Sequence, residues 1–135
     1  MAEATPGARP RPLSPHVMHW RWHVTMAASI LTRVTGVGSY IGLLLVAGWA
    51  LALASGRDAY EAYMGLLGSI PGQVVLFGFT VAVFFHLAAG LRHLIWDLGK
   101  GYQLRTADAS AWAAIIFSVV VSLALWAVFL MGAPQ

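Results

Sequence analysis

The sequence predicts an all-α membrane protein with three transmembrane helices and an N-terminal interfacial segment. Hydrophobic residues make up 59% of the 135 residues and charged residues only 10%, whereas an average soluble domain carries about a quarter charged residues. A chain of this length is too small to bury so many apolar side chains in its own core. Three apolar runs, at 26–54, 72–96 and 111–131, are each long enough to cross a bilayer, which takes roughly 20 helical residues.

Residues 1–25 are expected to form a cytoplasmic or interfacial arm before a three-helix transmembrane domain over residues 26–135. The run VMHWRWHVT at 17–25 is aromatic and basic, which is typical of a membrane interface. The arm lacks the apolar stretch of a secretory signal peptide. Its first part is kept extended by Pro6, Pro10, Pro12 and Pro15.

The three apolar runs should be helical, because backbone amides find no water partner in hydrocarbon. The segment SGRDAYEAY at 55–63 and the following GSIPG are expected to link the first two spans, and residues 97–110 link the second to the third. Arg57 is the single basic residue of the first link. Since the arm and the second link hold most of the others, the positive-inside rule places both on the cytoplasmic side of a bacterial inner membrane, or on the matrix side of a mitochondrial one. These other basic residues are Arg9, Arg11, Arg21, Arg92, Lys100 and Arg105, with Arg33 buried near them.

Several kinds of chemistry are excluded by composition and motifs. The absence of cysteine excludes thiolate-bound iron–sulfur clusters, covalently attached haem and disulfides. The sequence has no glycine-rich nucleotide loop, no nucleophile elbow and no paired catalytic carboxylates. The net charge of +3 forms no basic patch with interleaved aromatic residues, so nucleic acid is not an expected partner. Any electrons that pass through this chain must come from another protein.

His86 is the most informative side chain, because it lies deep in the second span. It precedes Trp96 by ten residues, or about 15 Å of helix. A polar ring at this depth is costly without a partner, and imidazole is a common ligand of haem iron. Gly90, one turn later, leaves room for a flat macrocycle or for another helix. A histidine hydrogen-bonded to a neighbouring helix explains the position equally well.

Arg33 and Ser29 form a second candidate site in the first span. They are four residues apart and therefore share a helix face. A guanidinium and a hydroxyl at one depth suit a quinone carbonyl, whose oxygen gains charge on reduction. A haem propionate is another partner for Arg33. Helix packing for Ser29 and snorkelling for Arg33 are the simpler interpretation.

Other polar residues in or near the spans have weaker signals. His93, seven residues after His86, either meets a haem propionate or reaches the interface, and Arg92 is expected to reach lipid headgroups. Asp97 either pairs with Lys100 or contacts a soluble partner. His19 and His23 have the i, i+4 spacing of metal ligands, but the sequence shows no carboxylate or thiol near them, which favours an interfacial role.

Gly38 and Gly42 form a pair of small residues four positions apart in the first span. This spacing favours close helix packing over a slot for a cofactor.

Three segments resemble the cytochrome b556 subunit of succinate dehydrogenase, the larger membrane anchor of complex II. They are RPLSPH at 11–16, SILTRVTG at 29–36 and HLAAGLRHLIWDLGKG at 86–101. The resemblance implies that His86 is an axial ligand of haem b and that Ser29 and Arg33 line the ubiquinone site. It also places Arg33 and His93 near the haem propionates. The family usually has histidine where this chain has Thr32, so the corresponding contact is not carried over.

The resemblance further implies the partners and the reaction. A flavoprotein subunit oxidises succinate, and an iron–sulfur subunit passes the electrons to ubiquinone. A small membrane anchor supplies the second haem ligand. The alternatives are a quinol:fumarate reductase anchor, a purely structural anchor without cofactor, and a cytochrome with both haem ligands on this chain. The last is disfavoured because only His86 lies deep in a span.

Overall fold

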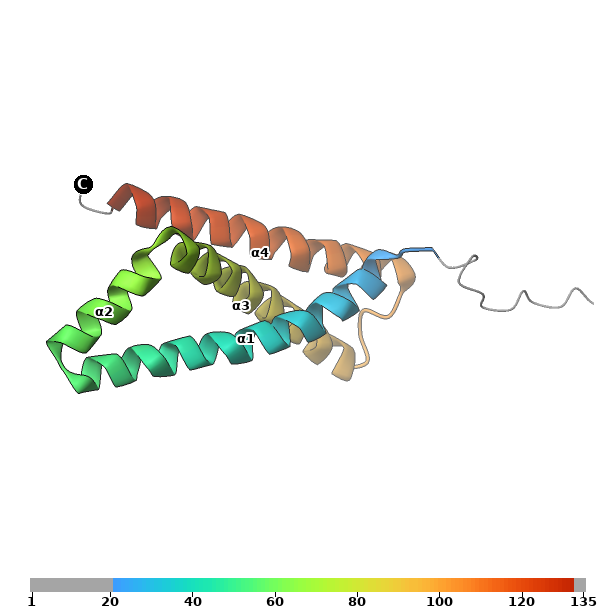
Figure 1. Cartoon of the computed structure of the whole chain (residues 1–135). Coiled ribbons are helices and arrows are strands. Elements are labelled where there is room, and N and C mark those ends of the chain that lie inside the picture. Colours follow the sequence, from blue (N-terminus) through green and yellow to red (C-terminus); the bar gives the residue numbers. More distant parts are fainter. Residues whose placement is uncertain (1–20, 133–135) are drawn as a thin grey trace, which may run out of the picture.

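The computed structural model describes residues 21–132, and all the regular structure in this range is helical. The helices are α1 (Val24–Ser55), α2 (Arg57–Gly68), α3 (Ile70–Asp97) and α4 (Leu104–Gly132) (Figure 1). Within the described range α1, α3 and α4 are long and apolar enough to span a membrane. The predicted fold class of three transmembrane helices is therefore confirmed, while the prolines of the arm lie outside the described residues.

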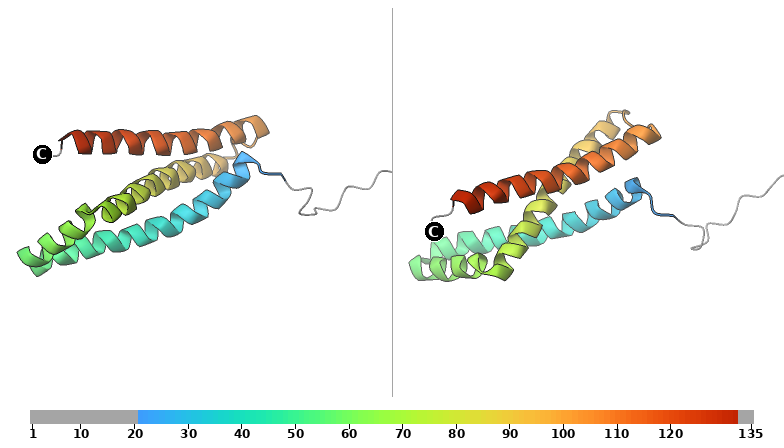
Figure 2. Two further views of the ribbon diagram at one scale, coloured as in Figure 1. Left: turned by 45° about the horizontal axis from the view of Figure 1, so that its top comes forward. Right: turned by 90° about the horizontal axis from the view of Figure 1, so that it is seen from above.

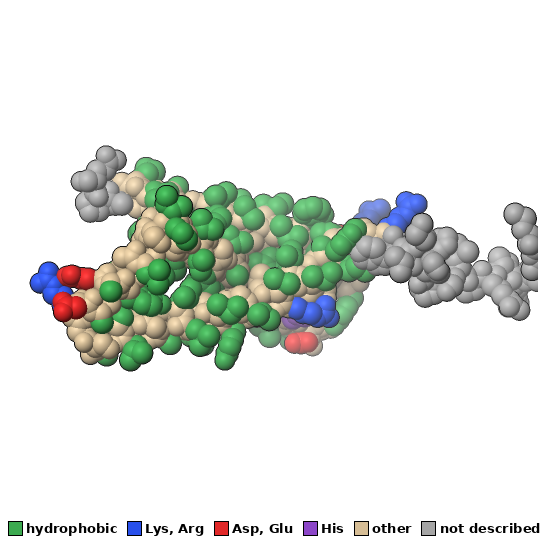
Figure 3. Space-filling view, viewed as in Figure 1, with side chains coloured by type: hydrophobic (Ala, Val, Ile, Leu, Met, Phe, Trp, Pro, Cys, Tyr) green, Lys and Arg blue, Asp and Glu red, His purple; other side chains and the backbone are tan. Residues whose placement is uncertain are grey.

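The three long helices run side by side, and α3 packs against both α1 and α4 (Figures 1 and 2). The start of α1 and the turn from α3 into α4 lie at one end of the molecule, which we call the arm end. The turn from α1 into α2 and the end of α4 lie at the opposite end. Apolar side chains cover the helices between these two ends (Figure 3). The placement of successive links at opposite ends of the molecule agrees with the topology expected from the sequence.

Small side chains form the centre of the helix packing. The core consists of Phe85 surrounded by the alanines 28, 89, 111 and 114, which come from α1, α3 and α4. Small residues let helix backbones approach closely where lipid provides no hydrophobic force between helices. Most large apolar side chains stay exposed instead. They are suited to hydrocarbon or to the helices of other subunits.

Gly38 and Gly42 lie where α1 crosses α3. A Cβ atom on Gly38 would lie 3.6 Å from the Cβ of Ala82, and one on Gly42 would overlap the ring of Phe79. The prediction that these glycines serve close helix packing is confirmed.

The first link differs from the expectation, because residues 57–68 form helix α2. Its first turn contains Asp58, which suits the positive end of the helix dipole. Arg57 Nε donates to Glu61 Oε1 over 2.7 Å, one turn later. The Tyr63 hydroxyl donates to the Leu45 carbonyl over 2.8 Å, which holds α2 against α1. Hydropathy alone does not register such a short amphipathic helix.

Helix α4 begins at Leu104, seven residues before the predicted start of the third span. The first turns are polar (RTADAS), so an apolar criterion assigned them to the link. Outside the hydrocarbon a helix continues through polar residues without penalty. This extension places Ala107, Asp108 and Ser110 on a rigid helix beside α1 and α3.

Candidate functional site

His86 lies in the middle of α3, eleven residues or about 16 Å before its end at Asp97. Its side chain is exposed on the surface of the helix bundle. Nδ1 of the ring lies 3.5 Å from the Thr35 hydroxyl on α1. A Cβ atom on Gly36 would lie 3.3 Å from Cε1 of the same ring. One edge of the imidazole therefore rests on α1, and Nε2 has no hydrogen-bond partner among residues 21–132.

Gly90 and His93 continue the face of α3 that His86 begins. All three residues are exposed, and they follow one another at intervals of one turn, so we call them the histidine face. No atom of another element lies within 4 Å of the position that a Cβ on Gly90 would take. Nδ1 of His93 donates to the Ala89 carbonyl over 2.7 Å, which leaves Nε2 of His93 as a free acceptor. The histidine face is thus open and carries two ring nitrogens that find no hydrogen-bond partner among residues 21–132.

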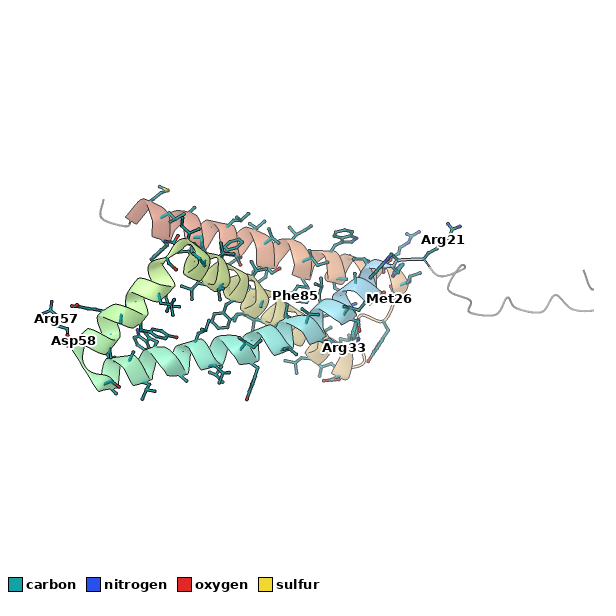
Figure 4. The ribbon with its side chains drawn as sticks, viewed as in Figure 1. Arg21, Met26, Arg33, Arg57, Asp58 and Phe85 are labelled. Carbon is teal, nitrogen blue, oxygen red and sulfur yellow. The ribbon has the colours of Figure 1, made fainter. Side chains whose placement is uncertain are left out.

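Ser29 and Arg33 meet on the exposed surface of α1, as their spacing predicted. Nη1 of Arg33 lies 3.1 Å from the Ser29 hydroxyl oxygen and 3.4 Å from its carbonyl oxygen. Arg33 lies in the half of α1 nearer the arm end, far from Arg57 and Asp58 (Figure 4). The structure therefore brings the guanidinium and the hydroxyl together at one depth.

No hydrogen bond in the described part of the chain joins Ser29 or Arg33 to His86. Arg33 precedes Thr35 by two residues, so it points about 160° away around α1 and lies about 3 Å nearer the arm end. The hydroxyl of Thr32 donates to the Ala28 carbonyl over 2.8 Å. Its one proton is thereby engaged within α1.

Arg92 does not reach lipid headgroups, so that expectation is wrong. The side chain is buried, with 8% exposed. Its Nε donates to the Ser110 hydroxyl over 2.9 Å and its Nη2 to the Ala107 carbonyl over 3.1 Å. The guanidinium carbon also lies 3.8 Å from the centre of the Trp96 ring. The early start of α4 supplies these acceptors, and Arg92 therefore joins α3 to α4.

Asp108 is a polar residue whose position sequence reasoning missed. Its Oδ2 lies 3.4 Å from Nε2 of His23, whose Nδ1 lies 2.8 Å from the Thr25 hydroxyl. The interpretation that no carboxylate lies near His23 is therefore wrong. The predicted topology places the arm and the start of the third span on the same side of the membrane, and this was the feature of the sequence that could have indicated that Asp108 lies near His23. His19 lies outside the described residues, and residues 21–132 contain no group of three or more His, Cys, Asp or Glu arranged for a metal ion.

Asp97 makes no ion pair with Lys100 among the pairs that the described residues form. A soluble partner of Asp97 remains a prediction.

Two large grooves lie away from these candidate residues. One of about 410 Å³ runs between α3 and α4 beside Leu91, Trp96 and Phe117. The other, also about 410 Å³, runs between α2, α3 and α4 beside Phe79 and Trp126. Neither is lined by Ser29, Arg33 or His86. The candidate residues thus lie on open faces of α1 and α3, which other chains can complete.

The fold and these faces define a class of protein: a helical protein with three candidate membrane spans that exposes an imidazole in the middle of the second one. The model of the family described as succinate dehydrogenase/fumarate reductase transmembrane subunit matches residues 7–125. The chain therefore belongs to this family.

Curated relatives include bacterial and mitochondrial proteins. The succinate dehydrogenase cytochrome b556 subunit of Paracoccus denitrificans is 36% identical over 88% of this chain and 92% of its own length. The b556 subunit of Rickettsia felis is 28% identical over 86% of this chain and 90% of its own. The mitochondrial cytochrome b560 subunit of Sus scrofa is 36% identical over 85% of this chain and 69% of its own.

Proposed function

We propose that this chain is the large membrane anchor of a succinate dehydrogenase and that His86 is one axial ligand of a haem b. The observation that carries the proposal is the exposed imidazole in the middle of α3. A neutral imidazole binds iron through its unprotonated nitrogen, and Nε2 is unpaired within residues 21–132. The cytochrome names of the relatives support a haem at this family's membrane anchor.

The residues present fit half of a haem site. His86 supplies one nitrogen ligand, and the open space at Gly90 leaves the histidine face flat enough for a planar group to approach. Within the described residues no second histidine lies at this depth, and we assign the other axial ligand to the small anchor subunit. When bound, the haem would supply a one-electron carrier. A propionate would accept a hydrogen bond from the Arg33 guanidinium. It would accept one from Nε2 of His93 when that ring carries a second proton, because the Nδ1 proton is donated to Ala89.

Ser29 and Arg33 are proposed to bind the quinone. The Arg33 guanidinium has five N–H donors, and its contacts with Ser29 use only Nη1. The remaining donors can bind a carbonyl oxygen of the quinone and stabilise the negative charge that it gains on reduction. Both residues are exposed, so residues of other chains are needed to enclose a bound quinone. We propose that the iron–sulfur subunit and the small anchor supply them.

The orientation follows from the positive charges. We place the arm end in the cytoplasm or mitochondrial matrix, where the iron–sulfur and flavoprotein subunits would dock and deliver electrons from succinate. The opposite end carries Arg57 and Asp58 (Figure 4), and Arg57 pairs there with Glu61. The family model includes fumarate reductases, so the reverse direction, from quinol to fumarate, is the alternative.

The hydrogen bond between His86 and Thr35 also suits a purely structural anchor. It occupies only one ring nitrogen, however, and the exposed second nitrogen favours a ligand role. The test is purification of the intact complex in mild detergent from wild type and from His86→Ala. The wild type should show a reduced-minus-oxidised b-type spectrum that is lost or weakened in His86→Ala and kept in His23→Ala. Full haem content in His86→Ala would refute the ligand assignment.

A further inference from the structure

We infer that Thr35 is a positioning residue for His86: its hydroxyl accepts a hydrogen bond from Nδ1 and thereby leaves Nε2 as the nitrogen with the free lone pair. The inference rests on the proposed function, because it concerns how His86 is prepared to bind iron. Thr35 lies on α1 and is not one of the two residues proposed to bind the quinone. The chain of contacts that supports it lies entirely within α1 and α3.

The hydroxyl of Thr35 has a single proton and two lone pairs. The Leu31 carbonyl lies 2.7 Å from Oγ1, the Thr32 carbonyl 3.3 Å, and Nδ1 of His86 3.5 Å. A carbonyl only accepts, so the shortest contact takes the hydroxyl proton. Toward His86 the hydroxyl therefore presents a lone pair. The matching partner is a protonated Nδ1.

This assignment fixes the tautomer of the ring. A neutral imidazole carries one proton, so a proton on Nδ1 leaves Nε2 bare. Ligand histidines commonly donate their other ring N–H to a neighbouring acceptor, which orients the ring and raises its basicity. Thr35 is itself buried, with 8% exposed. The acceptor is therefore held in place by the helix contact and shielded from competing donors.

Gly36 fixes the direction of the ring beside this hydroxyl. A Cβ at Gly36 would lie 3.3 Å from Cε1 and 3.7 Å from Nδ1 of His86. The Nδ1–Cε1 edge thus rests on the backbone of α1, and the edge with Nε2 faces away from α1. The exposure of the His86 side chain agrees with this arrangement.

His93 shows why Thr35 is needed at His86. At His93, Nδ1 donates to the carbonyl four residues earlier in the same helix, Ala89, over 2.7 Å. His86 makes no such bond to the carbonyl of Ala82 among the hydrogen bonds of the described range. Its tautomer is instead selected by a different helix. Loss of the Thr35 hydroxyl would therefore leave Nδ1 without an acceptor.

The test compares the intact complex with Thr35→Val, Thr35→Ala and Thr35→Ser by haem content and potentiometric titration. Weaker electron donation from His86 destabilises the ferric haem, so Thr35→Val and Thr35→Ala should raise the reduction potential of the haem. A tenfold change in the ratio of the affinities for ferric and ferrous haem corresponds to about 59 mV for one electron. Haem retention should also fall, by about 10–100-fold in apparent affinity. Thr35→Ser keeps the hydroxyl and should behave like wild type.

The matched control is Thr80→Val, which removes a hydroxyl that accepts from Trp126 Nε1 in α4 and donates to the Leu76 carbonyl, with no hydrogen bond to His86 in the described range. It should leave the potential unchanged. If Thr35→Val and Thr35→Ala also keep wild-type potential and haem content while His86→Ala loses haem, the inference on Thr35 is wrong and the ligand assignment stands.

A second readout does not depend on haem. In the full chain in lipid bilayers without haem, histidine ¹⁵N resonances assigned through His86→Ala report the tautomer directly. The wild type should show a protonated Nδ1 and a bare Nε2, and Thr35→Ala a mixture of both tautomers. A wild-type ring protonated at Nε2 would overturn the inference even if no haem is ever found. A wild-type complex without haem, by contrast, would overturn the proposed function.

Discussion

The Nε of Arg92 on α3 donates to the Ser110 hydroxyl on α4 over 2.9 Å, and this bond joins the two helices near the link between them. The same guanidinium reaches the Ala107 carbonyl and stacks on Trp96. The arginine is thus held by the protein itself rather than by lipid headgroups.

Loss of the Ser110 hydroxyl should destabilise the docking of α4. In Ser110→Ala the buried Nε of Arg92 loses its acceptor, which we expect to lower the free energy of unfolding by about 1–3 kcal/mol. Denaturant or thermal unfolding in detergent measures this change. Ser55→Ala is the matched control, because its exposed hydroxyl bonds only the Leu51 carbonyl of its own helix. Equal stabilities for both variants would contradict the proposed role of Ser110.

The crossing of α1 and α3 should tolerate no side chain at Gly42. A Cβ there would overlap the Phe79 ring, and overpacking of this kind typically costs about 1–3 kcal/mol. Gly42→Ala should therefore unfold at a lower temperature than wild type. Gly78→Ala has open space around its Cβ and should be up to about 1 kcal/mol more stable, because alanine favours helix. A stabilising Gly42→Ala would disprove the close packing of α1 on Phe79.

Arg33 should matter for quinone chemistry and not for succinate oxidation. Arg33→Ala removes the donors proposed for the quinone oxygen, and loss of such a donor reduces turnover by about 10²-fold. Quinone reduction by the purified complex should fall accordingly, while succinate oxidation by an artificial dye stays at the wild-type rate.

Arg57→Ala serves as the control for loss of an exposed arginine, since Arg57 pairs with Glu61 at the end of the molecule opposite the arm end. It should leave both rates unchanged. Normal quinone kinetics in Arg33→Ala would remove Arg33 from the proposed site.

The helices and the topology of this chain could be predicted from its sequence because the bilayer imposes simple rules. Long apolar runs must become helices, and positive charges collect on one side. The same rules made His86 conspicuous, because a polar ring in an apolar run costs free energy. Ser29 and Arg33 were paired correctly because a spacing of four residues always places two side chains on one helix face.

Contacts between helices could not be predicted from the sequence, because they depend on how the helices pack. Arg92 was expected at the headgroups, yet Ser110 and Ala107, brought close by the early start of α4, bind it inside the bundle. The pairing of His23 with Asp108 and that of Thr35 with His86 join residues far apart in the chain. Hydropathy and helix periodicity are local properties, and the amino-acid order alone therefore indicates which segments can span a membrane. How the helices rotate about their axes, and which polar groups meet as a result, depends on packing across the whole bundle.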